Sequence, residues 1–388
     1  LKVLLFEQAP EILEQRFGFR VASYGLRQVF KRVPDHPVLA GLDEEHLRDW
    51  RGEATLVPPH SAYPPDPKFN YAPTGRWCGI PVTRIWRCGN RGSVASVLIE
   101  KPVCGDFLPI VDGGFSLQYS PLLEYREGRG MILFCQLDVT ARSEPDPAAD
   151  SLANRVLAYT SSWKPLPRRT AVYVGEEAGR QNLAATGLGL QPYVGKLSAD
   201  QVLVVGPGGG VSLTEDAGAI SEWLQAGGHL LAIGLDPQDV EFLPSDIGIT
   251  QREHIAAYFP PPKSESLLRG VCPADVHNRD PRELPVITSG ASIVGDGVLA
   301  AQQDRSVVFC AMVPWQFEGA EQWNLKKTHR RSSYLVTRLL ANLGVAASTP
   351  IVDRFHVPVD SDAAPRWQTG LYVDHPELWD DPYRFFRW

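Results

Sequence analysis

The second half of the sequence alternates short, almost wholly apolar runs with an amphipathic segment, and this alternation limits the fold more than any other feature. The apolar runs are TAVYVG (170–175), QVLVVG (201–206) and HLLAIG (229–234), and TEDAGAISEWLQAGG (214–228) separates the last two. Thr214 fits a helix N-cap and Gly227-Gly228 fits a helix stop. Continuous apolar runs are typical of parallel strands buried on both faces. The strand–helix–strand order therefore predicts an α/β fold with a parallel sheet.

The same pattern of strand and helix occurs in both halves of the chain, which indicates an internal duplication. Two apolar runs end in Phe-Cys, at 134–135 and 309–310, and an amphipathic helical pattern follows each of them. We expect two flavodoxin-like α/β units, at 1–163 and 170–346. The linker at 164–169 holds two prolines and lies in a cluster of basic residues, and an aromatic-rich docking tail follows at 347–388. Residues 53–120, rich in Pro, Gly and aromatic side chains, predict a β/loop insert in the first unit.

Charge and hydropathy exclude several classes of protein. The chain has 388 residues and a formal net charge of −7, from 38 basic and 45 acidic residues. Nucleic-acid binding that ignores sequence needs a basic surface, which this balance does not favour. No apolar run approaches the roughly 20 residues of a membrane span. We therefore expect neither nucleic acid nor a membrane as a partner.

The cysteines do not suggest a metal site. Six cysteines show no CxxC pair and no Cys/His ligand spacing. Cys135 and Cys310 lie in apolar runs and are expected as small core residues. The sequence predicts no metal and no cofactor, and it leaves the compartment open. Leu1 is not a start methionine and no signal segment is visible, so we expect a processed product or a piece of a longer chain.

The first apolar run stops abruptly at Glu7. Val3-Leu4-Leu5-Phe6 is followed at once by a helical pattern, and such a sharp turn is where many α/β enzymes expose a nucleophile. A glutamate at this turn has two interpretations that the sequence leaves open. It is either a carboxylate placed at a neighbouring active site or a favourable charge at the N-terminus of the following helix.

These segments resemble the class I glutamine amidotransferases. Three segments of the first unit carry the resemblance: residues 5–21 are similar to the family's elbow and helix, HPVLAGL (36–42) to its middle signature, and LFCQL (133–137) to its F-H-P-E strand end. In the second unit, LAIGLD (231–236) resembles the elbow and GPGGG (206–210) the preceding glycine turn. The resemblance implies this fold in both units. It also implies that the first unit is truncated at its N-terminus, because the family has strands before the elbow strand.

The resemblance also places the family's catalytic triad on residues that cannot perform its chemistry. The cysteine position falls on Glu7 and Gly234, the histidine position on Cys135 and Cys310, and the glutamate position on Leu137 and Met312. Amide hydrolysis through a thioester needs a thiolate and a base. The expectation is therefore two inactive units. A cysteine amidohydrolase that uses Cys135 or Cys310 is the less favoured alternative.

Parts of the first unit also resemble the C-terminal region of large bacterial β-galactosidase-like glycoside hydrolases. The similar segments include RFGFRVASYGLRQVF (16–30), WRGEATLVPP (50–59) and the stretch 105–140. The resemblance implies a non-catalytic part that serves assembly or shapes the entrance of an active site. It implies an upstream catalytic region or a partner chain, a homo-oligomer, and a carbohydrate as the substrate of the parent enzyme.

An aromatic cluster in the expected insert suggests a second function, carbohydrate binding or scaffolding. Its members are Tyr71, Trp77, Trp86 and the neighbouring Arg87. Flat aromatic rings suit the apolar faces of sugars, and a guanidinium can donate to hydroxyl groups. The alternative is that these rings pack the insert onto the sheet, as large aromatic side chains usually do.

Three other motifs also have two interpretations each. Gly206–Gly210 could cradle a phosphate, but no Lys-Ser/Thr follows, which favours a tight turn. Asp112-Gly113-Gly114 predicts a turn, with a carboxylate aimed into a cleft as the alternative. Four polar residues near the end are expected as a solvated acidic stretch, with a cation site as the alternative: Asp374, His375, Asp380 and Asp381.

Overall fold

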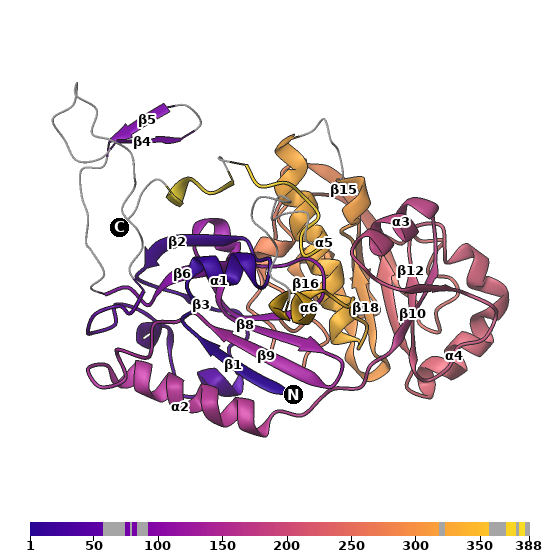
Figure 1. Ribbon diagram of the computed structural model, residues 1–388. Coiled ribbons are helices and arrows are strands. Elements are labelled where there is room, and N and C mark those ends of the chain that lie inside the picture. Colours follow the sequence, from indigo (N-terminus) through magenta and orange to yellow (C-terminus); the bar gives the residue numbers. More distant parts are fainter. Residues whose placement is uncertain are drawn as a thin grey trace.

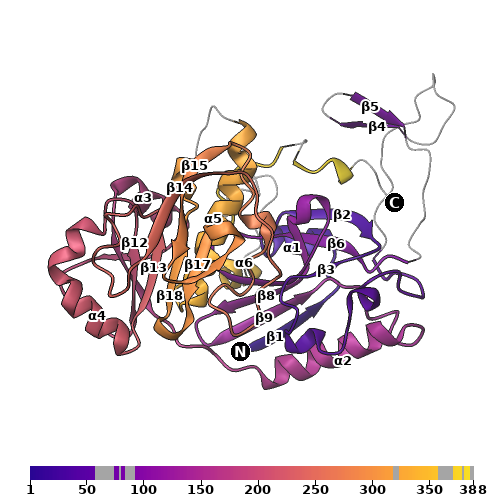
Figure 2. The same ribbon diagram turned by 180° about the vertical axis from the view of Figure 1, so that it is seen from behind.

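The computed structural model describes residues 1–56, 74–77, 80–83, 92–317, 323–356, 370–377 and 380–384. Two large sheets, each with helices packed on its faces, lie side by side (Figure 1) and keep this arrangement in the view from behind (Figure 2). This organisation confirms the α/β class predicted from the sequence. Within the described ranges, no helix has the length and apolar character needed to cross a membrane.

The first sheet has seven strands, and its parallel pair lies at one edge. β1 (Lys2–Phe6) is the edge strand and runs parallel to β9 (Gly130–Cys135). The antiparallel strands β8 (Tyr119–Glu127), β6 (Ala95–Glu100) and β2 (Val21–Leu26) follow in that order. β7 (Asp106–Gly113) pairs with β8 and with the short β3 (Phe30–Lys31). Among the described strands of this unit, the parallel arrangement is therefore confined to β1 and β9.

Side chains of the parallel pair alternate between two apolar layers. Leu4 and Leu133 point toward helix α2 (Pro147–Ser162), whose Leu152 lies in the same cluster. Leu5 and Phe134 point to the opposite face, where residues around the short helix α1 (Pro10–Gln15) complete a second cluster. This period of two is the ordinary geometry of a strand covered on both faces.

Residues 95–113, which the sequence analysis placed in the insert, are central strands of the first sheet. Every residue of β6 and β7 is buried. The segment misleads because prolines and glycines punctuate it, and these residues usually mark loops. Pro109 lies at an irregularity in the pairing of β7 with β8, a position where a strand tolerates proline. Of the remaining insert, β4 (Thr74–Trp77) and β5 (Ile80–Thr83) form an antiparallel hairpin.

The second sheet is parallel over most of its width. Its parallel strands, in spatial order, are β11 (Leu190–Pro192), β10 (Thr170–Val174), β12 (Gln201–Val205), β13 (His229–Ile233) and β18 (Val307–Cys310). Two antiparallel strands, β17 (Leu299–Gln302) and β16 (Ser292–Val294), complete the edge. A separate ribbon joins β14 (Gly248–His254) to β15 (Arg282–Ser289). The parallel core matches the apolar runs that predicted it.

Helices cover both faces of this second sheet. α5 (Lys326–Asn342) packs in the core cluster of one face, to which Leu183 of α3 (Glu177–Ala185) also belongs, and α4 (Ala217–Gln225) packs on the other. The helix expected at 214–228 is shorter than predicted, because a 3-10 turn occupies Val211–Asp216. Its predicted stop is present, since Gly227 adopts a left-handed φ of 94°.

The two units and the tail form a continuous body. Arg338 of α5 donates to the backbone oxygen of Phe107 at 2.7 Å, and Arg32 of the first unit donates to that of Gly270 at 2.6 Å. In the tail, Tyr372 is 6% exposed and donates to the Glu100 carbonyl at 2.8 Å. The short helix α6 (Ile351–His356) contributes Ile351 to the same layer of the first unit. Contacts far apart in sequence therefore join the units.

Candidate functional site

The turn after β1 has the backbone of a strained elbow. Glu7 follows the last strand residue and adopts a φ of 45°, and α1 begins three residues later at Pro10. A residue other than glycine rarely takes this left-handed conformation, because its Cβ crowds the following carbonyl. The Glu7 amide donates to the Cys135 carbonyl at 2.8 Å, which continues the β1–β9 pairing into the turn. The sequence therefore located the elbow correctly.

The Glu7 carboxylate ties the elbow to the loop that follows β9. One oxygen accepts from the amides of Val139 and Thr140, at 2.7 and 2.8 Å. The other accepts from the hydroxyl groups of Thr55 and Thr140. Residue Ala9, and not Glu7, precedes the first turn of α1, and no side chain caps it. The helix-capping interpretation is therefore wrong.

The residue after the elbow is also bonded. In α/β hydrolases the backbone N–H that follows the nucleophile helps to bind the reacting oxygen. Here the Gln8 N–H donates to the side-chain oxygen of Gln136 at 2.8 Å, and the Gln136 amide donates back to the Gln8 carbonyl at 2.8 Å. The donor that would face a substrate is thus engaged within the chain.

Both strand-end cysteines lie in the core. Cys135 is 0% exposed and Cys310 is 2% exposed. Their thiols face the backbone carbonyls of Leu137 and Met312, at 3.8 and 3.5 Å. Burial raises the pKa of Cys310 to about 12, and burial, together with the nearby Glu7 charge, raises the pKa of Cys135 further. A thiol that stays protonated near neutral pH is a poor nucleophile.

The second unit repeats the elbow without a side chain. Gly234 follows β13, has a φ of 60°, and its amide donates to the Cys310 carbonyl at 2.8 Å. A Cβ at this position would lie 2.2 Å from a methyl carbon of Val313. At the positions of the family's glutamate, Leu137 and Met312 are both fully buried. The six triad positions therefore hold two buried thiols, two buried apolar side chains, a glycine and a tied carboxylate.

The glycine loop of the second unit holds a carboxylate of its own chain. The amides of Gly208 and Gly210 donate to the two carboxylate oxygens of Asp239, at 2.8 and 3.0 Å. Asp239 is 1% exposed. The loop therefore has the amide geometry that binds anions, but the buried Asp239 occupies it. This favours the tight-turn interpretation of Gly206–Gly210 over a phosphate site.

The expected sugar-contact residues fall almost wholly outside the described part of the chain. Tyr71, Trp86 and Arg87 lie outside the described residues, and of Trp77 only the backbone, in β4, is described. The carbohydrate interpretation of this cluster stays a prediction.

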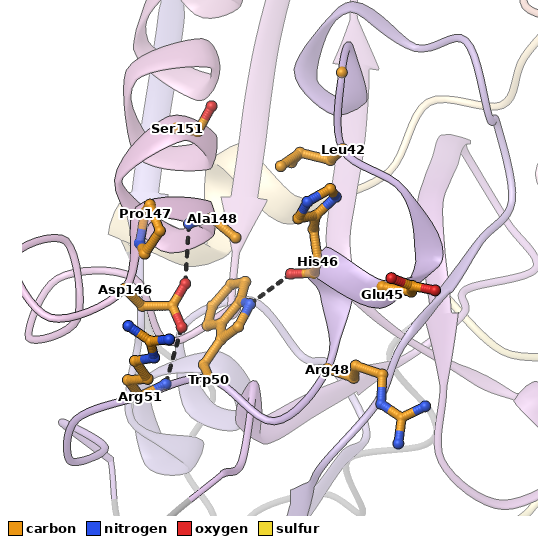
Figure 3. A pocket seen from close by; sticks show the side chains of 11 residues that line it. Leu42, Glu45, His46, Arg48, Trp50, Arg51, Asp146, Pro147, Ala148 and Ser151 are labelled. Carbon is orange, nitrogen blue, oxygen red and sulfur yellow. Dashed lines mark hydrogen bonds between the residues drawn. The ribbon is translucent and has the colours of Figure 1, made fainter.

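A hollow of about 330 Å³ lies beside the first unit, between residues 41–51 and the start of α2 (Figure 3). Asp146 lines it and accepts from the amides of Ala148 and Arg51, both at 2.9 Å. The Trp50 ring N–H donates to the His46 carbonyl at 2.7 Å. These bonds cap α2 and fasten the preceding segment, so the polar groups drawn together here serve the fold.

Sequence reasoning missed a set of buried ion pairs at the junction of the units and the tail. Asp374 pairs with Arg20 and Arg330, and Asp380 pairs with Lys326 at 2.8 Å. Burial opposes ionisation of Asp374, but the two guanidinium groups outweigh it and lower its pKa below the usual value. The solvated acidic stretch is therefore wrong for these two residues. The signal was hidden because each partner lies far away in sequence.

The Asp112-Gly113-Gly114 motif belongs to the same kind of junction. Asp112 is a buried residue of β7 and accepts from Arg32 at 2.5 Å and from Lys101 at 3.2 Å. Arg32, fully buried, also pairs with Asp275 of the second unit. The turn begins only at Gly114, where φ is 73°. In the part of the chain that the structure describes, no group of three or more His, Cys, Asp or Glu could hold a metal ion.

Comparison with known proteins gives little further information. No family model matches the sequence, and no curated protein matches it. Among solved structures, a GMP synthase subunit from Thermoplasma acidophilum matches with 10% identity and a TM-score of 0.27. The match covers 45% of this chain and 96% of that chain. Such a TM-score and identity carry no conclusion about function.

Proposed function

We propose that this chain is a non-catalytic part of a β-galactosidase-like glycoside hydrolase, built from two degenerate amidotransferase-like units. Its role is to support assembly of the enzyme or to shape the entrance of a sugar site. The link to glycoside hydrolases rests on the sequence resemblance of the first unit, which is an argument from analogy. The catalytic carboxylate pair of such an enzyme would belong to another region or chain.

The observation that carries the proposal is the closure of both elbows. A nucleophile elbow needs a free attacking group, a base and open donors for the developing charge. At Glu7 the carboxylate accepts from two amides and two hydroxyl groups of the same chain. At Gly234 there is no side chain, and Val313 fills the space where one would lie. Neither arrangement provides the groups for acyl transfer.

The edge of the first sheet supports an assembly role. β1 is an edge strand among the described residues, and Val3 to Phe6 are only partly buried although they are apolar. An unpaired, apolar strand edge is a template for pairing with another strand. A strand from a partner chain or from another part of the same polypeptide fits this edge.

The first experiment tests for catalysis by the chain alone. Purified protein is incubated with chromogenic galactosides and, separately, with a thiol-reactive glutamine analogue. We expect no turnover above the buffer rate and no labelling of Cys135 or Cys310 in the folded protein, with labelling after unfolding in urea as the positive control. Robust turnover that Glu7→Gln abolishes, or stoichiometric labelling of either thiol in the folded state, contradicts the proposal.

A second experiment tests the assembly role. Light scattering coupled to size exclusion should report a mass above that of one chain, or a stable complex with a catalytic region of a glycoside hydrolase. Leu4→Lys and Leu5→Lys, which place a charge on β1, should weaken that association. Lys2→Glu at the exposed start of the strand is the milder control. A monomer with no affinity for such a region contradicts the assembly role.

The alternative function is carbohydrate binding without chemistry. Calorimetry with oligosaccharides separates the two, because binding lost in Trp77→Ala and Trp86→Ala would favour a binding module. Saturable heat that both substitutions leave unchanged would count against the aromatic cluster as the sugar site.

A further inference from the structure

A cavity of about 220 Å³ lies where the linker passes between the two units. Arg126, near the end of β8, and Gly128 line it from the first unit, and Asn342 of α5 lines it from the second. Arg168 and Arg169 line it from the linker, so the basic residues noticed there in the sequence face a common space. The volume is below the roughly 300–1,000 Å³ of sites for drug-sized molecules, which suits a small ligand.

Guanidinium nitrogens around this cavity are buried without a hydrogen-bond partner among the described residues. They are Nη1 of Arg126, Nε of Arg169, Nη2 of Arg338 and Nε of Arg269. Arg126 is 6% exposed, and the side chain of Arg338 is 0% exposed. A buried donor without a partner is costly, so native structures rarely leave several together. The cluster therefore has spare donors for an acceptor-rich ligand.

The charges around the cavity do not balance. Asp106 pairs with Arg168 and Arg338, both at 3.1 Å. Glu124 pairs with Arg126 and also accepts from Tyr159 at 2.6 Å and Trp163 at 3.1 Å. Glu127, also nearby, accepts from Tyr125 and Ser348 instead. Two carboxylates therefore face five guanidinium groups, of Arg126, Arg168, Arg169, Arg269 and Arg338.

The protonation of Arg269 reflects the same excess. Burial, followed by repulsion from Arg126 and Arg338, lowers the pKa of Arg269 to about 10. Arg126 behaves oppositely, because Glu124 and Asp106 outweigh its burial and raise its pKa. The carboxylates thus hold one arginine of the cluster fully charged, while another is left without enough negative charge.

We propose that the cavity at the linker binds a small, multiply charged oxyanion of the phosphate class. Arg126, Arg168 and Arg169 supply the donors, because guanidinium groups present planar pairs of N–H bonds that match such oxygens. The bound anion bridges the first unit, the linker and α5, and so fixes the two units against each other. This proposal goes beyond the assembly role and does not depend on it.

The test begins with the full chain and inorganic phosphate. Melting temperature and calorimetric heat are followed from zero to millimolar phosphate, with sodium chloride holding the ionic strength constant. We expect a saturable rise in melting temperature and a single binding site. The absence of a saturable effect overturns the proposal. Galactose 1-phosphate in place of phosphate identifies the source: tighter binding points to a sugar phosphate, and equal or weaker binding to the free ion.

The decisive variants place an internal anion in the cavity without removing an arginine. Gly128 has a φ of 54°, and a Cβ there would meet nothing within 4 Å. Gly128→Asp supplies a carboxylate, and Gly128→Asn supplies the same shape without charge, and both residues tolerate this backbone conformation. We expect Gly128→Asp to weaken phosphate binding at least about tenfold and Gly128→Asn to stay within about twofold, since only one changes the charge. Equal binding by the two variants overturns the proposal.

A second pair removes a donor. Arg169→Gln takes one guanidinium from the cavity, whereas Arg180→Gln removes an exposed arginine whose ion pair is with Glu177. Phosphate affinity should fall about tenfold in the first and remain unchanged in the second, because a charged hydrogen bond contributes about 1.5–3 kcal/mol. Circular dichroism without phosphate confirms that both fold. Equal loss in both, or loss in neither, contradicts the assignment of the site.

Discussion

The two elbows share a backbone but close in different ways. In each, the residue after the strand adopts a left-handed φ, 45° at Glu7 and 60° at Gly234, and its amide bonds a strand-end cysteine carbonyl at 2.8 Å. Beyond that point the first unit fills the turn with a carboxylate bonded to Val139 and Thr140. The second unit has no side chain there, and Val313 packs in its place.

This difference shows that the backbone of an elbow can persist after its chemistry has gone, provided that some group takes up the space and the donors. A polar closure retains a side chain at a conformation that costs about 1–2 kcal/mol. An apolar closure avoids that cost by using glycine, but it then excludes any Cβ. The two units therefore tolerate opposite substitutions, and this asymmetry can be measured.

The largest effect is expected at the second elbow, for Gly234→Ala. Its new methyl group would lie 2.2 Å from Val313 and would occupy a left-handed φ. Overpacking and backbone strain together should lower the free energy of unfolding by about 2–4 kcal/mol. Urea unfolding measures this value.

Gly128→Ala is the matched control, because its φ is 54° and its Cβ would meet nothing within 4 Å. It should cost about 1 kcal/mol, from the backbone term alone. If both variants lose the same stability, Val313 does not close the second elbow.

At the first elbow, Glu7→Ala should lower the free energy of unfolding by about 2 kcal/mol. The substitution leaves the buried Val139 amide and its neighbour without their acceptor, and it keeps the unfavourable φ. Glu7→Gly loses the same bonds but relieves the φ, so it should be about 1 kcal/mol more stable than Glu7→Ala. Greater stability of the alanine variant would contradict the strained elbow.

The strand-end thiols predict a dependence on alkaline pH. The folded pKa of Cys310, about 12, lies above the ordinary value of about 8.5, so the folded state keeps its proton after the unfolded state has lost it. This stabilisation is complete below pH 8.5 and is lost as the pH rises from there toward 12. Each thiol should steepen the decline by up to about 1.4 kcal/mol per pH unit.

The measurement is the slope of unfolding free energy against pH between 8.5 and 10. Cys310→Ala and Cys135→Ala should each flatten it to a similar degree, because both thiols are buried. An unchanged slope in either variant would mean that the thiol ionises normally in the folded protein.

The smallest effect is expected for Glu7→Gln, at or below about 1 kcal/mol. The amide keeps one oxygen for the Val139 and Thr140 donors, while the hydroxyl groups of Thr55 and Thr140 can rotate to accept from its nitrogen. Thermal unfolding at neutral pH detects this change. A loss as large as that of Glu7→Ala would show that the negative charge, and not the acceptor geometry, holds the elbow.

The sequence predicted the elbows well because their signals are local. An apolar run that ends at once in a turn marks Glu7 and Gly234 without reference to the rest of the chain. The strands β6 and β7 were missed because Pro109, Gly105 and Gly113 resemble loop punctuation, and only the neighbouring strands bury them. What occupies each elbow was also missed, since Glu7 meets residues that lie 132 and 133 positions away.

The sequence by itself determined the α/β class, the duplication and the loss of the reactive groups, because strand periodicity and side-chain chemistry are properties of short segments. Only the tertiary structure decided how the elbows are filled and how the acidic tail pairs with Arg20 and Arg330. It alone also brought the arginines of β8, the linker and α5 around one cavity. These outcomes depend on contacts between residues hundreds of positions apart, for which a linear pattern carries no signal.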